Sequence, residues 1–85
     1  MLNGSCLCGS VEYQADCEPN VMIHCHCQTC RKAHSAAFSS VMPINPKAFK
    51  WTRGEDLLQN FESSPGKKRF FCTRCGSQLI TERKE

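Results

Sequence analysis

The chain of 85 residues has few of the large apolar side chains that build a protein core. Leucine, isoleucine, valine and phenylalanine account for 16 residues, below the level of about 20% at which chains often fail to form a core. A domain of this size buries only about 60–65% of its unfolded surface, so disulfides or metal must supplement the packing. The composition therefore excludes a domain held together by apolar contacts alone.

Membrane-spanning and secretory segments are also missing from the sequence. No apolar run approaches the length of about 18 residues that a transmembrane helix needs, and no charged segment followed by an apolar one opens the chain. The net charge is only +3, and the basic residues are scattered except for Lys67-Lys68-Arg69, which gives no argument for nucleic-acid binding. We expect a soluble, cytoplasmic protein without a membrane partner.

Cysteine, in contrast, is abundant: there are eight, and seven of them fall into three tight groups. A tetrahedral zinc ion with Zn–S bonds of about 2.3 Å holds its sulfurs about 3.8 Å apart, which a Cys-x-Cys pair on a strand or a Cys-x-x-Cys turn can match. Seven ligands divide into four, which close a structural site, and three, which leave a position open for chemistry. The sequence therefore predicts two zinc sites and a fold that requires metal. The groups are Cys6-x-Cys8, Cys25-x-Cys27-x-x-Cys30 and Cys72-x-x-Cys75.

The main alternative for the cysteines is a secreted disulfide scaffold, because an even cysteine count in a short chain is typical of one. Disulfide frameworks usually join cysteines from distant parts of a chain, whereas Cys-x-Cys and Cys-x-x-Cys groups suit a single ion. We therefore favour metal ligation. Cys17 belongs to none of the groups, and we expect it to be a lone thiol without a metal role.

Short apolar segments separated by turn residues predict an all-β domain of short strands with at most one short helix. The chain has no repeat or linker, so we expect a single zinc-stapled domain over residues 1–85. The expected helix covers residues 28–34 and holds Cys30 in its first turn, and the strongest turn signal is Ser63-Ser64-Pro65-Gly66. Strands are expected at 5–14, 21–23 (buried), 37–42, 48–52, 57–61, 68–71 and 78–81.

Three ordered motifs give the chain a close resemblance to a known family, the glutathione-dependent formaldehyde-activating enzymes, which also includes the domain of centromere protein V. The resemblance spans nearly the whole chain and implies an all-β, tent-like fold with two zinc sites. The motifs are Gly4-Ser5-Cys6-x-Cys8-Gly9, His24-Cys25-His26-Cys27-x-x-Cys30-Arg31-Lys32 and Ser64-Pro65-Gly66…Arg69-Phe70-Phe71-Cys72-x-x-Cys75-Gly76-Ser77.

The same resemblance implies a role for each cysteine group. By it, the first and last groups (Cys6, Cys8, Cys72, Cys75) form the structural site, and Cys25, Cys27 and Cys30 hold the catalytic zinc. The structural set would close a loop of more than sixty residues, which restricts the unfolded chain. The chain is C-terminally short relative to typical members, since it stops at Glu85; we expect an exposed sheet edge or a homodimer to follow.

A zinc ion held by three thiolates can accept a fourth from glutathione and activate it as a nucleophile. The resemblance thus implies a carbon–sulfur lyase that forms or cleaves S-(hydroxymethyl)glutathione at Cys25, Cys27 and Cys30. Because glutathione carries two carboxylates, we expect Arg31 to help bind it, with Arg53 or Arg69 as further candidates. The alternatives are a non-catalytic zinc module of the same fold that contacts protein or nucleic acid, and a family member that folds without catalysing.

The remaining polar and aromatic candidates are weaker. If residues 24–27 are extended, His24 and His26 point away from the neighbouring cysteines, so packing or hydrogen bonding is expected of them rather than ligation. His34 lies one helical turn after Cys30, where it could be a fourth ligand or a proton carrier, although a surface position is the simpler expectation. Arg69 reads most simply as an exposed strand residue, and the core is expected to contain Phe38, Phe49, Trp51, Phe61, Phe70 and Phe71.

Overall fold

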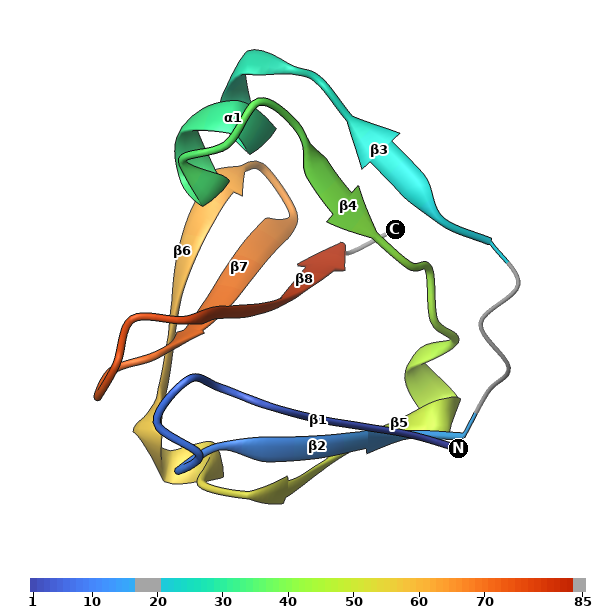
Figure 1. The fold of residues 1–85 in the computed structure, drawn as a ribbon, viewed down its shortest axis with the longest axis vertical. Coiled ribbons are helices and arrows are strands. Elements are labelled where there is room, and N and C mark those ends of the chain that lie inside the picture. Colours follow the sequence, from blue (N-terminus) through green and yellow to red (C-terminus); the bar gives the residue numbers. More distant parts are fainter. Residues whose placement is uncertain (17–20, 84–85) are drawn as a thin grey trace.

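A computed structural model of the chain describes residues 1–16 and 21–83, so that Cys17 lies outside the described residues. The described residues form eight short strands, one α-helix and two 3-10 turns, which confirms the all-β class expected from the sequence (Figure 1). No described helix has the length and apolar character needed to cross a membrane.

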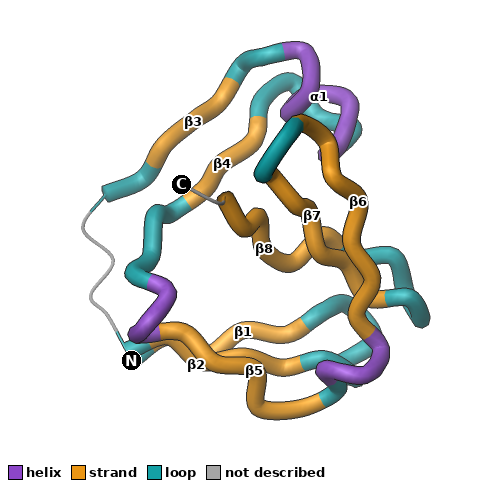
Figure 2. Tube along the Cα trace, turned by 180° about the vertical axis from the view of Figure 1, so that it is seen from behind, coloured by secondary structure: helices purple, strands orange, loops and turns teal. Residues whose placement is uncertain are grey.

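The strands form three small antiparallel sheets, with strand orders β1-β2-β5, β3-β4 and β6-β7-β8. The sheets stand around the middle of the molecule instead of stacking in parallel layers, and α1 lies beside one end of β6 and β7 (Figures 1 and 2). This arrangement agrees with the tent-like fold that the resemblance implies. The elements are β1 (Leu2–Ser5), β2 (Glu12–Ala15), β3 (Ile23–Cys25), α1 (Gln28–His34), β4 (Ser39–Val41), η1 (Pro46–Ala48), β5 (Phe49–Arg53), η2 (Glu55–Leu57), β6 (Leu58–Ser64), β7 (Lys67–Cys72) and β8 (Gln78–Arg83).

The third sheet is a meander whose middle strand is β7. A tight turn at Pro65 and Gly66 joins β6 to β7, with φ of 79° at Gly66, so the turn expected there is confirmed. Pairing of Arg69 with Phe61 on one side and Thr81 on the other fixes the register of the sheet. Paired residues in an antiparallel sheet share a face, so Arg69 and Phe61 lie on the same face of this sheet.

The first expected strand, over residues 5–14, is wrong. The chain forms a hairpin there, and Cys6 and Cys8 lie in the connection between β1 and β2 instead of on a strand. The amide of Gly9 donates to the carbonyl of Cys6 over 3.1 Å, and the φ of 78° at Gly9 turns the chain back into β2. The two sulfurs are therefore brought together by a turn and not by the pleat of a strand.

The expected buried strand at residues 21–23 is also wrong. Its strand begins only at Ile23, as β3, and Val21, Met22 and Ile23 are all exposed. The physical reason is that β3 pairs with β4 alone, in a two-stranded ribbon of the described chain. In contrast, α1 covers the helix residues expected from the sequence, Gln28–His34.

The apolar core of the described residues is small and lies beside the first and last cysteine groups. Val11 and Cys72 are its largest fully buried side chains, and Cys6 joins them. The half-buried side chains packed against this core are Trp51, Leu57, Leu58, Cys75 and Leu79.

The aromatic side chains only partly follow the expectation that they lie in the core. Phe49 and Trp51 are half-buried and pack against Tyr13 on one face, with ring centroids 5.4 Å and 5.9 Å from that of Tyr13; the contact of Trp51 is edge-to-face. Phe38 and Phe61 were expected in the core and are exposed, with Phe61 at 68%. The apolar packing is therefore too sparse to account for the fold by itself, and we expect the cysteine sites to supply the remaining stability.

Candidate metal centres

The first and last cysteine groups come together in space, although more than sixty residues separate them. Cys6 and Cys8 come from the turn after β1, Cys72 is the last residue of β7, and Cys75 follows in the connection to β8. Their four Sγ atoms all lie within 4.8 Å of one another. The Cys6 and Cys8 sulfurs are 3.6 Å apart, and those of Cys8 and Cys72 are 3.9 Å apart.

Backbone geometry around this group directs amide hydrogens at the sulfurs. The amide of Val11 donates to Cys6 Sγ over 3.4 Å, and that of Arg74 donates to Cys72 Sγ over 3.3 Å. Gly76 has a φ of 79°, and its amide donates to the carbonyl of Cys72 over 2.7 Å. Amide donors of this kind stabilise deprotonated sulfur.

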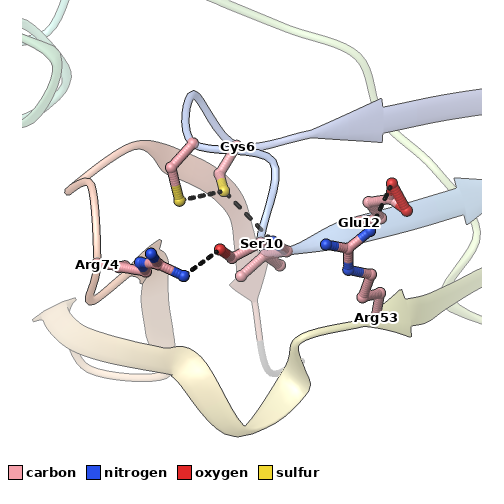
Figure 3. A network of polar contacts seen from close by, with 7 residues as sticks. Cys6, Ser10, Glu12, Arg53 and Arg74 are labelled. Carbon is pink, nitrogen blue, oxygen red and sulfur yellow. Dashed lines mark hydrogen bonds and ion pairs between the residues drawn. The ribbon is translucent and has the colours of Figure 1, made fainter.

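Side chains close to the group add further contacts. Figure 3 shows Arg74 reaching across to the Ser10 hydroxyl, a hydrogen bond of 3.2 Å that joins the last cysteine group to the first. The Ser10 hydroxyl lowers the pKa of the Cys8 thiol, while burial raises that of Cys72. The Ser77 hydroxyl, 3.2 Å from Cys75 Sγ, contributes most to lowering the pKa of Cys75 to about 5.

The donor set of this group fits a zinc ion. The sulfurs lie close to the spacing of about 3.8 Å that tetrahedral zinc requires, and amides and hydroxyls point at them as they would at thiolates. All seven described cysteines are free thiols, which removes the disulfide scaffold as an alternative for them. Four cysteines of this kind can close the coordination shell of one ion.

The second group, Cys25, Cys27 and Cys30, is assembled by the start of α1. Cys25 ends β3, Cys27 is the N-cap of the helix, and Cys30 lies in its first turn. The Cys27 sulfur accepts from the Cys30 amide over 3.3 Å, which replaces the serine or aspartate usual at an N-cap. The Cys25 and Cys27 sulfurs are 3.4 Å apart, and the three sulfurs lie within 4.8 Å of one another. Three sulfurs at this spacing can hold a metal ion and leave one position of its shell free.

The three-cysteine group has a protein side and a solvent side. Cys30 is buried, whereas Cys27 is exposed and Cys25 is intermediate. On the protein side, Arg69 Nη2 lies 3.6 Å from Cys30 Sγ, and Arg69 Nε donates to Ser63 Oγ over 2.9 Å. Hydrogen bonding from Cys25 and then from Arg69 lowers the pKa of the Cys30 thiol to about 6.

Arg69 was expected to be an exposed strand residue, and this is wrong: it is only 4% exposed. Arg69 lies in β7 between the exposed Lys68 and the half-buried Phe70, and its guanidinium reaches the Cys30 sulfur of the cysteine group held by α1. Arg53, the other further candidate, pairs with Glu12 at 3.8 Å on the first sheet (Figure 3). Arg31 is exposed on α1 next to Cys30 and forms no ion pair within the described residues.

None of the described histidines joins the cysteine groups. His24 and His26 both pack against Phe38, with ring centroids 5.1 Å and 5.0 Å from its own. The His24 ring is nearly perpendicular to that of Phe38, and His24 Nδ1 also lies 2.9 Å from Ser40 Oγ. His34 is half-buried on α1, and burial followed by the positive charge of Arg69 lowers its pKa.

Sequence reasoning missed three serines at the two cysteine groups. Ser77 contacts Cys75, Ser63 holds Arg69, and Ser39 pairs with Cys25 across the β3–β4 ribbon. Ser77 follows Cys75-Gly76 directly, so its place in the motif was a usable signal. Ser63 and Ser39 carry no such signal, because only the fold brings them to the second group.

Fold and sites together define a class: a small β domain with one closed four-cysteine centre and one open three-cysteine centre, each able to hold a metal ion. The whole chain, residues 1–85, matches the family described as glutathione-dependent formaldehyde-activating enzyme. The chain belongs to this family, as the three motifs indicated.

Two relatives place the chain further. It is 32% identical over 81 residues to an uncharacterized lyase of Schizosaccharomyces pombe; the match covers 89% of this chain and 53% of the relative, so the chain spans about half of that protein. A crystal structure of a Rhodobacter sphaeroides protein superposes with a TM-score of 0.82 at 22% identity, covering 98% of this chain and 75% of that one. This second likeness concerns the fold alone.

Proposed function

We propose that this chain is a zinc-dependent carbon–sulfur lyase that forms or cleaves adducts of glutathione with an aldehyde such as formaldehyde. The observation that carries the proposal is the group of Cys25, Cys27 and Cys30, with one buried and one exposed sulfur, separate from the four-cysteine group. A protein that needed zinc only to fold would have no use for an incomplete, solvent-facing second set. Family membership and the relative called a lyase support the same chemistry.

The chain's residues would divide the work as follows. Cys25, Cys27 and Cys30 would hold the zinc ion, which when bound lowers the pKa of an incoming thiol and keeps it as a nucleophilic thiolate. Buried Cys30 fixes the protein side of the site, and exposed Cys27 leaves the other side open to a substrate thiol. Thiolate ligands donate charge to their metal, which favours exchange of thiols over activation of water.

The reaction balances without any further reagent. In the forming direction the glutathione sulfur bonds to the aldehyde carbon, the carbonyl π electrons move to oxygen, and the thiol proton ends on that oxygen. Cleavage reverses each of these movements. Arg31, exposed on α1 beside Cys30 and without an ion pair among the described residues, is the residue we assign to a glutathione carboxylate. A glutathione substrate also suits a cytoplasmic location, which we propose for the protein.

The test is to load the protein with cobalt in place of zinc and follow the visible spectrum of the metal during a titration with glutathione. We expect a saturable change that is absent in Cys27→Ser. The variant Arg31→Gln should weaken binding of glutathione severalfold but leave binding of 2-mercaptoethanol, which lacks carboxylates, unchanged. A cobalt spectrum that changes with neither thiol would rule out the lyase. Salt-dependent binding of DNA in the same preparation would favour the non-catalytic module.

A further inference from the structure

The polar side chains buried in the described part of the chain are gathered at one place. Within residues 1–16 and 21–83 the buried polar residues are Ser39, at 3% exposure, and Arg69, at 4%. Ser39 pairs with Cys25 across the ribbon, and Arg69 reaches Cys30. Burying polar groups is unfavourable unless they find partners, so their position beside the same three cysteines needs a physical reason.

Arg69 lacks the partner that a buried arginine usually has. The ion pair present among the described residues joins Arg53 to Glu12, and no described carboxylate lies within ion-pairing distance of Arg69. Its guanidinium contacts Ser63, which is uncharged, and the Cys30 sulfur. A buried cation requires a counter-charge, and the nearest available one is sulfur in its thiolate form.

A metal at the three cysteines would supply this counter-charge. Three thiolates around a divalent ion leave about one net negative charge, which the single positive charge of Arg69 offsets. A fourth thiolate from a substrate adds a second negative charge to the site. The cation on the protein side would therefore favour both the metal complex and the binding of an anionic thiol to it.

We infer that Arg69, oriented by Ser63, is a positioning residue that stabilises metal binding by Cys25, Cys27 and Cys30 and the arrival of a fourth thiolate there. It acts through Cys30 and not by contacting the substrate, because it is buried behind the group. This role differs from the binding of a glutathione carboxylate, for which Arg69 was only a further candidate from the sequence. The inference rests on the proposed metal at these cysteines, and its second half rests on the proposed function.

The decisive variant is Arg69→Gln, which keeps a polar side chain and removes the charge. Lys68→Gln is the matched control, since it removes a charge from the adjacent, exposed position of the same strand. Arg69→Lys restores the charge without the planar fork. The protein is loaded with cobalt at both sites, and a chelator then extracts it; the extraction phase that Cys27→Ser abolishes belongs to the three-cysteine group.

We expect the affinity of that group for cobalt to be about 10–100-fold lower in Arg69→Gln than in the unchanged protein, the range typical of residues that support a metal ligand. Lys68→Gln should match the unchanged protein, and Arg69→Lys should recover a large part of the loss. Cobalt at the four-cysteine group should be unaffected, and its spectrum reports that the variant is folded. Equal retention in Arg69→Gln and Lys68→Gln would overturn the inference.

Thiol titrations separate this inference from the proposed function. Arg69→Gln should weaken glutathione and 2-mercaptoethanol by the same factor, because the effect passes through the metal; a loss confined to glutathione would overturn a role through Cys30. If the unchanged protein binds neither thiol while Arg69→Gln still releases cobalt, the lyase fails and the support of the metal by Arg69 stands. If Arg69→Gln does not fold, Ser63→Ala decides: it should release cobalt severalfold faster, and normal retention would overturn the inference.

Discussion

The backbone amide of Leu7 donates to the hydroxyl of Ser77 over 2.9 Å, across a separation of 70 residues in the sequence. Ser77 Oγ also lies 3.2 Å from the sulfur of Cys75, and the Ser77 carbonyl accepts from the amide of Cys72 over 3.0 Å. One serine thus ties the turn between Cys6 and Cys8 to the turn between Cys72 and Cys75. This residue therefore helps to hold the sulfurs from the two ends of the chain in register.

Replacing Ser77 with alanine should therefore loosen the four-cysteine centre. The lost hydrogen bonds are worth about 0.5–1.5 kcal/mol each, and the Leu7 amide would be left with water as its partner. We expect urea to unfold Ser77→Ala at a lower concentration than the unchanged protein. Ser64→Ala is a suitable control, because Ser64 is an exposed strand serine. An unchanged midpoint in Ser77→Ala would contradict the bracing role.

The two cysteine groups should differ in their importance for folding. Structural zinc contributes about 10–16 kcal/mol in small domains, which equals or exceeds the whole stability of a typical domain. Cys72 belongs to the small apolar core and to the four-cysteine group, whereas Cys27 is exposed. We expect Cys72→Ser to abolish folding and Cys27→Ser to leave a folded protein with one equivalent of metal.

Native mass spectrometry counts the bound metal ions, and circular dichroism measures folding, on the same samples. Exhaustive chelation should unfold the unchanged protein, and added zinc should restore it. A chelated protein that keeps its near-ultraviolet dichroism and its sharp unfolding transition would show that packing suffices. The choice of serine at position 27 matters, since serine preserves the N-cap of α1 that the Cys27 sulfur provides.

Features determined by neighbouring residues could be predicted from the sequence. The clustering of sulfurs within each cysteine group and the helix α1 that starts at the second group depend on nearby residues, and both were expected correctly. The turn that brings Cys6 and Cys8 together was not expected. The pairing of the first with the last group is a long-range relationship, and it came from the resemblance to a family. The turn at Gly9 was read as a bend within one strand, because the apolar alternation continues on both sides of it.

Burial of a polar residue could not be predicted in the same way. Arg69 ends the basic run Lys67-Lys68-Arg69, and lysine and arginine side chains are mostly exposed in proteins. Its partner Cys30 lies 39 residues earlier, and nothing local to β7 indicates that contact. Phe61 shows the opposite error, since its aromatic character suggested burial, whereas it lies on the edge strand β6 and is 68% exposed.

His34 should respond to pH because burial, and then the charge of Arg69, hold its pKa below the usual 6.5. A histidine with a lowered pKa in the folded state binds protons more readily when the chain is unfolded. The stability it confers is therefore complete above pH 6.5 and is lost as the pH falls below that value. We expect the free energy of unfolding to drop less in His34→Gln than in the unchanged protein between pH 7.5 and pH values below 6.5.

Comparing the two proteins cancels the loss of metal from acidified thiolates, which both share. Nuclear magnetic resonance of the His34 ring gives a direct check, and its pKa should rise toward 6.5 in Arg69→Gln. An unshifted ring titration in the unchanged protein would refute this account of His34.

Two glycines with nearly the same φ should respond differently to alanine. Gly54 and Gly76 have φ of 77° and 79°, a region that costs other residues about 1–2 kcal/mol. A methyl group at Gly76 would meet no atom within 4 Å, so Gly76→Ala should show that strain alone. At Gly54 the methyl would overlap the carbonyl of Ser10, and relieving the overlap should cost about 1–3 kcal/mol more.

Urea unfolding of the two zinc-loaded variants measures the difference directly. We expect Gly54→Ala to be the less stable of the two, because Ser10 and Val11 lie in the connection just before β2, beside the four-cysteine group. They cannot move away without moving the turn that holds Cys6. The backbone of that turn is anchored by the bond of 3.0 Å from the Cys6 amide to the Val11 carbonyl. Equal destabilisation by the two substitutions would mean that Ser10 and Val11 move away at no cost, and that the close approach of Gly54 does not help to hold the metal centre in place.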